Sequence, residues 1–326
     1  MNRAAALVPT TPAAQLAPLA QLEERARDYA AAAHAPNTLR AYASDLRAFA
    51  SWCRSHGVAS LPAEPRTVAL YLTALADTGR RPSTIGRALT AINIAHVRAG
   101  LPAPREAAAV RDAWRGMRRV LSVAPRQKAP LLVEDLRALA IALPSTLRGI
   151  RDRAILVLGW AMGARRSEIV ALDVADLRLT AEGFEVTIRR SKTDQEGEGH
   201  RLGVPFGSTP ATCPVRTVLA WKAAAAVNEA GPLFCSLKNA RPTGRPLDGR
   251  DLARIVKAAA ELAGLAAAEL AGHSLRAGLI TQAARQGKAE RDIMRHTGHR
   301  SAATLRRYIR AAELFAPSNP AQGIGL

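Results

Sequence analysis

A short segment rich in proline and basic residues divides this chain into two parts with different patterns. Ser122–Pro130 (SVAPRQKAP) carries two prolines, an arginine, a lysine and few apolar side chains, which predicts a linker over residues 123–130. The chain has 326 residues, enough for two domains of ordinary size. We expect domains over residues 21–122 and 131–326, preceded by a flexible arm over residues 1–20. Prolines interrupt that arm, which argues against a signal peptide.

The first part predicts a small helical bundle. Apolar residues recur at steps of three and four in four successive stretches, as they do on one face of a helix. These stretches contain Leu39–Cys53, Val68–Leu75, Ile85–Ile92 and Val110–Leu121. Asn37 or Thr38 can cap the first helix, and Gly57, Gly79 and Gly100 follow the ends of the first three.

The second part predicts a mixed but mainly helical domain. Helical patterns cover about 133–143, 148–162, 214–229, 247–264, 274–286, 289–297 and 302–315. Residues 184–190 and 201–206 alternate as strands do, with a polar, glycine-containing turn over 191–200 between them. The longest apolar stretch, Ala154–Ala164, is too short to span a bilayer and predicts a buried helix.

Charge indicates the partner. Lys and Arg outnumber Asp and Glu by 46 to 27, a net charge of +19, which favours a polyanion such as nucleic acid. A genome rich in GC, which favours Arg codons, would contribute to the same excess. The three cysteines form neither a ligand cluster nor a disulfide framework, so we expect a reducing cytoplasm, no membrane and no metal or other cofactor.

Four short stretches contain residue types that catalyse phosphoryl chemistry. Arg165 and Glu168 follow the apolar helix, His273 and Arg276 share a helix face, and a helix break at Gly298 separates His299 from Tyr308. Lys192 lies in the turn between the two strands. Each has an ordinary interpretation: a surface ion pair, a chance His-x-x-Arg, a core tyrosine, a solvated lysine.

Together, and in this order, these residues resemble the active-site set of the tyrosine recombinase (phage integrase) family. The resemblance covers about residues 35–316 and is strongest to the Cre-like members, through stretches such as Pro62–Pro65, Arg98–Pro104 and Leu233–Cys235. His299 departs from those members, which have Trp there, but most of the wider family has His. Either ring can donate an N–H.

The resemblance implies a fold and a mechanism. The fold would be a SAM-like helical core-binding domain followed by a mostly α catalytic domain with a small antiparallel β-sheet. Tyr308 would attack the scissile phosphate and form a 3′-phosphotyrosyl link. Arg165 and Arg276 would bind the non-bridging oxygens, Lys192 would protonate the leaving oxygen, and His273 would assist proton transfer at Tyr308. His299 would donate to a non-bridging oxygen, and Glu168 would support its neighbours.

The resemblance also implies contacts and an assembly. Major-groove contacts would come from Thr38, Arg40, Ala41, Ser83, Arg87 and Arg250, although contacts to phosphate alone are as compatible with these residues. We expect a homotetramer on double-stranded DNA with inverted-repeat sites, which exchanges strands through a Holliday junction. The enzyme would belong to a bacterial mobile element and act in the cytoplasm, associated with the nucleoid. Its C-terminal tail would dock either on a neighbouring subunit or on its own domain. The rival functions are DNA relaxation of the type IB topoisomerase kind and inactive DNA binding. The sequence does not disclose the target site, its spacer or the direction of recombination.

Overall fold

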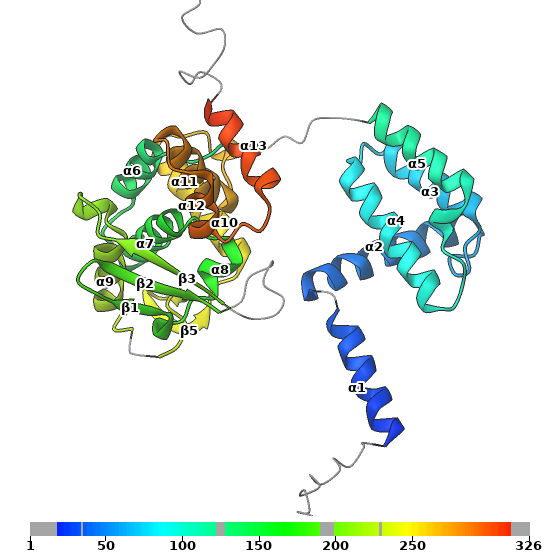
Figure 1. Cartoon of the computed structure of the whole chain (residues 1–326), viewed down its shortest axis with the longest axis horizontal. Helices are drawn as coiled ribbons and strands as arrows, with labels where there is room; N and C mark the ends of the chain where they lie inside the picture. Colours follow the sequence, from blue (N-terminus) through cyan, green and yellow to red (C-terminus); the bar gives the residue numbers. More distant parts are fainter. Residues whose placement is uncertain (1–17, 34, 122–127, 190–198, 228–229, 314–326) are drawn as a thin grey trace, which may run out of the picture. The chain divides into compact units, whose positions relative to one another are not determined.

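The structure is a computed structural model that describes residues 18–33, 35–121, 128–189, 199–227 and 230–313 (Figure 1). Contacts divide the chain into two compact units, Met1–Arg126 and Gln127–Leu326. The division falls inside the segment that the sequence assigns to a linker.

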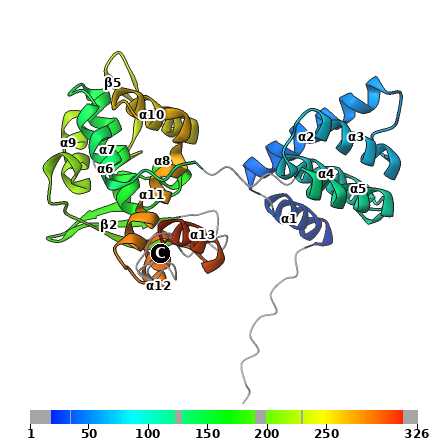
Figure 2. The same cartoon turned by 90° about the horizontal axis from the view of Figure 1, so that it is seen from above.

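The first unit is helical throughout its described part. Its elements are α1 (Leu19–Ala32), α2 (Pro36–Ser55), α3 (Pro65–Asp77), α4 (Pro82–Arg98), the 3-10 helix η1 (Pro104–Glu106) and α5 (Ala108–Val120). Within it α2 packs on α4 and α3 packs on α5, and Figure 2 shows these pairs side by side. The four helices of the predicted bundle are confirmed.

Helix boundaries in this unit follow from proline and glycine. Pro36, Pro65 and Pro82 occupy the first turns of α2, α3 and α4, where the missing N–H costs nothing. The prediction that Asn37 or Thr38 caps α2 is wrong, because that helix already begins at Pro36, and Ala35 precedes it. The core contains Phe49, Tyr71, Leu72, Ile85, Leu89 and Ile92. The described residues of α1 are mostly exposed; this Ala- and Glu-rich helix lacks a strong apolar face, so its pattern did not predict it.

The second unit surrounds a larger core. Its helices are α6 (Val133–Ala142), α7 (Leu147–Met162), α8 (Arg166–Val170), α9 (Pro214–Ala224), α10 (Gly249–Leu262), α11 (Gly272–Arg285), α12 (Glu290–Thr297) and α13 (Ala302–Glu313), with 3-10 turns η2 (Val174–Asp176), η3 (Pro210–Thr212) and η4 (Ala267–Glu269). Helix α7, predicted to be buried, lies in the core and packs on α9 and α11. None of the described helices is long and apolar enough to cross a bilayer.

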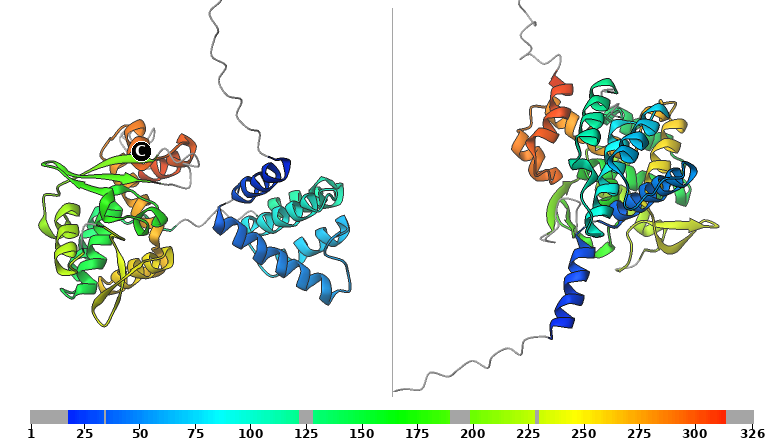
Figure 3. Two further views of the ribbon diagram at one scale, coloured as in Figure 1. Left: turned by 90° about the horizontal axis from the view of Figure 1, so that it is seen from below. Right: turned by 90° about the vertical axis from the view of Figure 1, so that its right-hand side faces the viewer.

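Two small antiparallel sheets complete this unit. One has the order β1 (Leu177–Leu179), β2 (Gly183–Ile188) and β3 (His200–Pro205), with Phe184 opposite Val204 and Ile188 opposite His200. Buried residues alternate along β2 and β3, and β3 packs on α7 and α9. The predicted strand pair is thus confirmed. The other sheet is a hairpin of β4 (Cys235–Lys238) and β5 (Arg241–Pro246) at the edge of the unit (Figure 3).

Candidate active site

The loop after α7 holds Arg165 rigidly. Gly163 ends α7 in the left-handed conformation (φ 55°), and Arg165 then caps α8. Glu168 accepts a bond from the backbone N–H of Arg165 through Oε2 (2.7 Å) and one from its Nη1 through Oε1 (2.7 Å). The side chain of Glu168 is 3 % exposed and that of Arg165 20 %, so this is not a surface ion pair. The carboxylate fixes both the backbone and the guanidinium of Arg165.

Arg276 projects from α11 toward the same loop. It is buried, and its Nη1 donates to the carbonyl oxygen of Gly163 (2.7 Å). Burial, and then the positive charge of Arg165, lower the pKa of Arg276 to about 10, which leaves it charged at neutral pH. A Cβ on Gly163 would lie 2.6 Å from Cδ2 of Leu279 and 2.9 Å from Cγ2 of Thr297. Only glycine therefore fits between these helices in this backbone conformation.

His273, three residues before Arg276 on α11, meets Tyr308 from α13. Its Nε2 lies 2.5 Å from the Tyr308 hydroxyl oxygen. Partial desolvation, with the charges of Arg276 and Arg165, lowers the pKa of His273, so the ring is neutral at pH 7 and can accept a proton. Tyr308 itself packs against a small cluster of Ile280, Ile293 and Leu305, which fixes α13 against α11 and α12. Helix α11 begins at Gly272, and in its first turn the Ser274 hydroxyl accepts from the N–H of Ala271.

The break between α12 and α13, which the sequence predicted at Gly298, places His299 beside Arg276. Gly298 ends α12 in the left-handed conformation (φ 65°). Nη2 of Arg276 lies 3.0 Å from Nε2 of His299, and Oγ1 of Thr297 lies 2.6 Å from its Nδ1. Desolvation and the charges of Arg276, Arg165 and His273 lower the pKa of His299 to about 4.

Five of the six predicted catalytic residues therefore converge. Arg165 lies in the loop after α7, His273 and Arg276 lie at the start of α11, His299 follows α12, and Tyr308 lies within α13. The sixth, Lys192, lies outside the described residues. Within the described ranges no group of three His, Cys, Asp or Glu side chains could hold a metal ion.

The predicted DNA-reading residues of the first unit lie on α2 and α4. Arg40 and Ser83 are exposed, and Thr38 and Ala41 are half-buried. Arg87 does not extend freely: its Nε and Nη2 bond both oxygens of Asp45 (2.8 and 3.1 Å), which ties α4 to α2. In the second unit Arg250 is exposed in the first turn of α10, where its Nε contacts Asp248 (3.2 Å).

Three positions that the sequence reasoning did not single out belong to this site. Gly163 allows the close approach of three helices, and Thr297 bonds His299. His200, at the start of β3, lies with its Nε2 3.2 Å from the carbonyl oxygen of His296. One sequence feature could have pointed to Thr297, because it lies two residues before His299 at a helix end. His200 carried no such signal.

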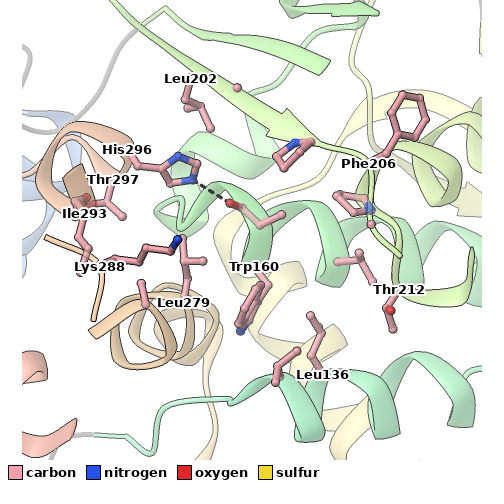
Figure 4. A pocket seen from close by; sticks show the side chains of 18 of the residues that line it. Leu136, Trp160, Leu202, Phe206, Thr212, Leu279, Lys288, Ile293, His296 and Thr297 are labelled. Atoms are coloured by element: carbon pink, nitrogen blue, oxygen red, sulfur yellow. Dashed lines mark hydrogen bonds between the residues drawn. The ribbon is translucent and has the colours of Figure 1, made fainter. Parts of the chain in front are cut away.

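A cavity of about 690 Å³ adjoins Thr297, two residues before His299 (Figure 4). Apolar side chains such as Leu136, Trp160, Leu279 and Ile293 line it, together with Arg201 and Lys288. Thr297 and His296 belong to its wall, and His296 Nε2 donates to the carbonyl oxygen of Ala161 (2.8 Å).

Comparison with known proteins identifies the family. The phage integrase family model matches residues 131–314, and the model of the phage integrase N-terminal SAM-like domain matches residues 29–94. An integrase/recombinase XerD homologue of Selenomonas ruminantium is 37 % identical over 286 residues, which cover 86 % of this chain and 83 % of that protein. The chain belongs to the phage integrase family.

Other phage integrase relatives agree with this assignment. The Cre recombinase of Escherichia phage P1 is 28 % identical, with 85 % of each chain covered. The identity to the XerD homologue is higher, so the Cre-like stretches are only part of the likeness. A λ integrase fragment solved as a dimer on a core DNA site has a similar fold, with a TM-score of 0.59 and 16 % identity, covering 89 % of this chain and 94 % of that one. Like its relatives, this chain is a tyrosine site-specific recombinase, an enzyme that cleaves and rejoins DNA.

Proposed function

We propose that this recombinase forms its covalent link to DNA through Tyr308. The observation that carries the proposal is the 2.5 Å contact between the Tyr308 hydroxyl and Nε2 of His273, beside two arginines. A neutral histidine at hydrogen-bond distance is placed to take the phenol proton. The Tyr308 oxygen then attacks phosphorus, the bond from phosphorus to the 5′ oxygen breaks, and a 3′-phosphotyrosyl link forms.

Arg165 and Arg276 bind the non-bridging oxygens of the scissile phosphate. A guanidinium offers paired donors that match phosphate oxygens, and it stabilises the charge that develops in the transition state. The bonds of Arg165 to Glu168 and of Arg276 to Gly163 support this role, because they hold both groups before DNA arrives. His299 donates to a non-bridging oxygen, and Lys192 protonates the leaving 5′ oxygen. The covalent link conserves the energy of the phosphodiester, so rejoining needs no cofactor.

The predicted assembly is a homotetramer on two DNA sites with inverted arms, which exchanges strands through a Holliday junction. A λ integrase tetramer has been solved on such a junction, which supports this assembly through shared family membership. The C-terminal tail that follows α13 would dock on a neighbouring subunit, and the apolar cavity beside α12 offers a surface of suitable chemistry. Exposed Arg40 and Arg250 would contact DNA. The enzyme would act in the bacterial cytoplasm, at the nucleoid, as part of a mobile element.

Covalent trapping tests the proposal. Purified protein is mixed with nicked duplexes from the DNA around its gene, and an adduct that resists SDS is sought. We expect an adduct that requires one particular sequence and that Tyr308→Phe abolishes while DNA binding stays within a few-fold. An adduct on any sequence would favour relaxation of the topoisomerase kind. An adduct that persists in Tyr308→Phe would overturn the assignment of the nucleophile.

A further inference from the structure

Thr297 constrains where His299 carries its proton. Oγ1 of Thr297 lies 2.6 Å from the carbonyl oxygen of Ile293 and 2.6 Å from Nδ1 of His299. A carbonyl oxygen only accepts, and a hydroxyl has one proton, so the Thr297 hydroxyl donates to Ile293. Toward His299 the same oxygen can only accept. Nδ1 therefore carries the proton of the neutral imidazole.

The other ring nitrogen is then bare. Nε2 of His299 lies 3.0 Å from Nη2 of Arg276, and a guanidinium has donors only. The same Nη2 lies 3.1 Å from Nδ1. An atom almost equally far from both ring nitrogens lies over the face of the imidazole and not along the Nε2 lone pair. This contact is compatible with either tautomer, so the assignment rests on the hydrogen bonds of Thr297.

The surrounding turn holds the ring in this orientation. Thr297 is buried, and the backbone N–H of His299 donates to the carbonyl oxygen of Met294 (3.1 Å). His200 bonds the carbonyl oxygen of His296, and the ring of His296 in turn bonds the carbonyl oxygen of Ala161. Bonds to β3 and α7 therefore fix His296, the residue before Thr297. Figure 4 shows His296 and Thr297 next to each other in the cavity wall.

We propose that Thr297 is a positioning residue that fixes His299 as the Nδ1–H tautomer, so that His299 serves the phosphate as an imidazolium formed when DNA binds. The proposal rests on the proposed role of His299 as a donor to a phosphate oxygen. A neutral His299 has its only N–H on Thr297 and cannot donate through Nε2. It must gain a proton, and the negative phosphate favours that proton.

Burial, and then the charges of cationic neighbours, keep the ring neutral until then. The lowered pKa of His299 agrees with a ring that is uncharged at pH 7 in the absence of DNA. The charged and titratable groups nearest the His299 ring are Arg276 and His273 on α11 and Arg165 with its partner Glu168 at α8. Tyr308 on α13 lies next to His273, and His200 on β3 lies near Gly298. Of these only Glu168 is a carboxylic acid, and it is bonded to Arg165.

The tautomer is tested directly by NMR without DNA. Protein labelled with ¹⁵N at histidine is compared with Thr297→Val, which keeps the branched shape and removes the acceptor, and Thr297→Ser, which keeps the hydroxyl. His299→Gln identifies the resonance. We expect the Nδ1–H pattern in the natural protein and in Thr297→Ser, and a shift toward Nε2–H in Thr297→Val. An Nε2–H pattern in the natural protein would overturn the proposal, whatever the behaviour of the variants.

The catalytic consequence is tested by a ratio of rates. Cleavage of a nicked duplex is measured for Thr297→Val and Thr297→Ser from pH 6 to 9, with DNA binding and thermal melting as checks of folding. Titration of Tyr308 and His273 cancels in the ratio. We expect the Val-to-Ser ratio to rise with pH, by about tenfold per unit above the pKa of His299 in the complex, since only the Ser enzyme must protonate His299. A constant ratio would mean that Thr297 only packs. Either variant still forms an adduct at Tyr308, so failure here is separate from failure of the proposed function.

Discussion

The buried carboxylate of Glu168 offers the sharpest test of how the site is built. Glu168→Gln preserves shape but places an amide N–H₂ or a neutral oxygen where Oε1 and Oε2 now accept two bonds from Arg165, each 2.7 Å long. A hydrogen bond to a charged group contributes about 1.5–3 kcal/mol, and this pair is largely removed from water. We expect the free energy of unfolding to fall by about 2–3 kcal/mol. For a unit of this size that corresponds to a loss of roughly 4–12 °C in Tm.

The cleavage rate of Glu168→Gln should fall by more than the loss of folded protein would explain. Arg165 would keep its charge but lose the group that aims it, and a small misplacement at a reacting centre costs on the order of 10²-fold in rate. Thermal unfolding and the covalent adduct assay measure the two effects. DNA binding should stay within a few-fold, because Arg165 is one cation among many.

Glu185→Gln is the matched control. Glu185 on β2 also bonds an arginine twice, with Arg178 Nη2 at 2.5 Å and Nε at 3.0 Å, but its side chain is 49 % exposed and that of Arg178 is 70 % exposed. Exposed pairs contribute little to stability. We expect little change in Tm or cleavage. Equal losses of Tm in the two variants would refute the claim that burial strengthens the Glu168 pair. A Glu168→Gln enzyme that binds DNA poorly yet cleaves normally once bound would refute the claim that Glu168 orients Arg165 for cleavage.

Two further predictions concern the turns and the histidines. Gly163→Ala adds a left-handed backbone cost of about 1–2 kcal/mol and an overpacking cost of about 1–3 kcal/mol. Urea unfolding should therefore show a larger loss of unfolding free energy than for Gly298→Ala, whose added Cβ meets nothing nearer than 3.8 Å. Equal losses in the two variants would contradict the packing argument. Without DNA, stability should fall as the pH drops from about 6.5 toward about 4, because His273 and His299 have lowered pKa values when folded and the unfolded chain binds more protons there. His299→Gln should make this fall shallower in urea titrations at pH 7 and pH 5, and an unchanged slope would show that His299 does not contribute.

The sequence predicted most of the fold because apolar spacing and glycines fix helices locally. The stops at Gly57, Gly79, Gly100 and Gly298 all fall where the structure has left-handed glycines. The β4–β5 hairpin was missed because β5 is exposed along its whole length and so has no alternation to detect. Helix α9 ends at Ala224, earlier than the predicted residue 229, since its alanines continue the pattern beyond the packed region.

The site was predictable as a set of residue types but not as a network. Only the resemblance linked Arg165, His273, Arg276, His299 and Tyr308, because these residues come from four separate segments of the chain. Contacts to backbone carbonyls, such as Arg276 on Gly163 and His200 on His296, leave no trace in composition or spacing. Such contacts depend on how distant helices pack.

The way in which the chain enters the catalytic unit has a mechanical consequence. Ala129 N–H bonds the carbonyl oxygen of Glu269, and Leu131 N–H bonds that of Ser274, in the first turn of α11. The Leu131 carbonyl oxygen accepts from Trp160 (2.8 Å) and lies where a side chain on Gly278 would stand. A pull on the linker is therefore delivered to the helix that carries His273 and Arg276. Tension along the linker would thus reach the start of α11, where His273 and Arg276 lie, through the bond between Leu131 and Ser274.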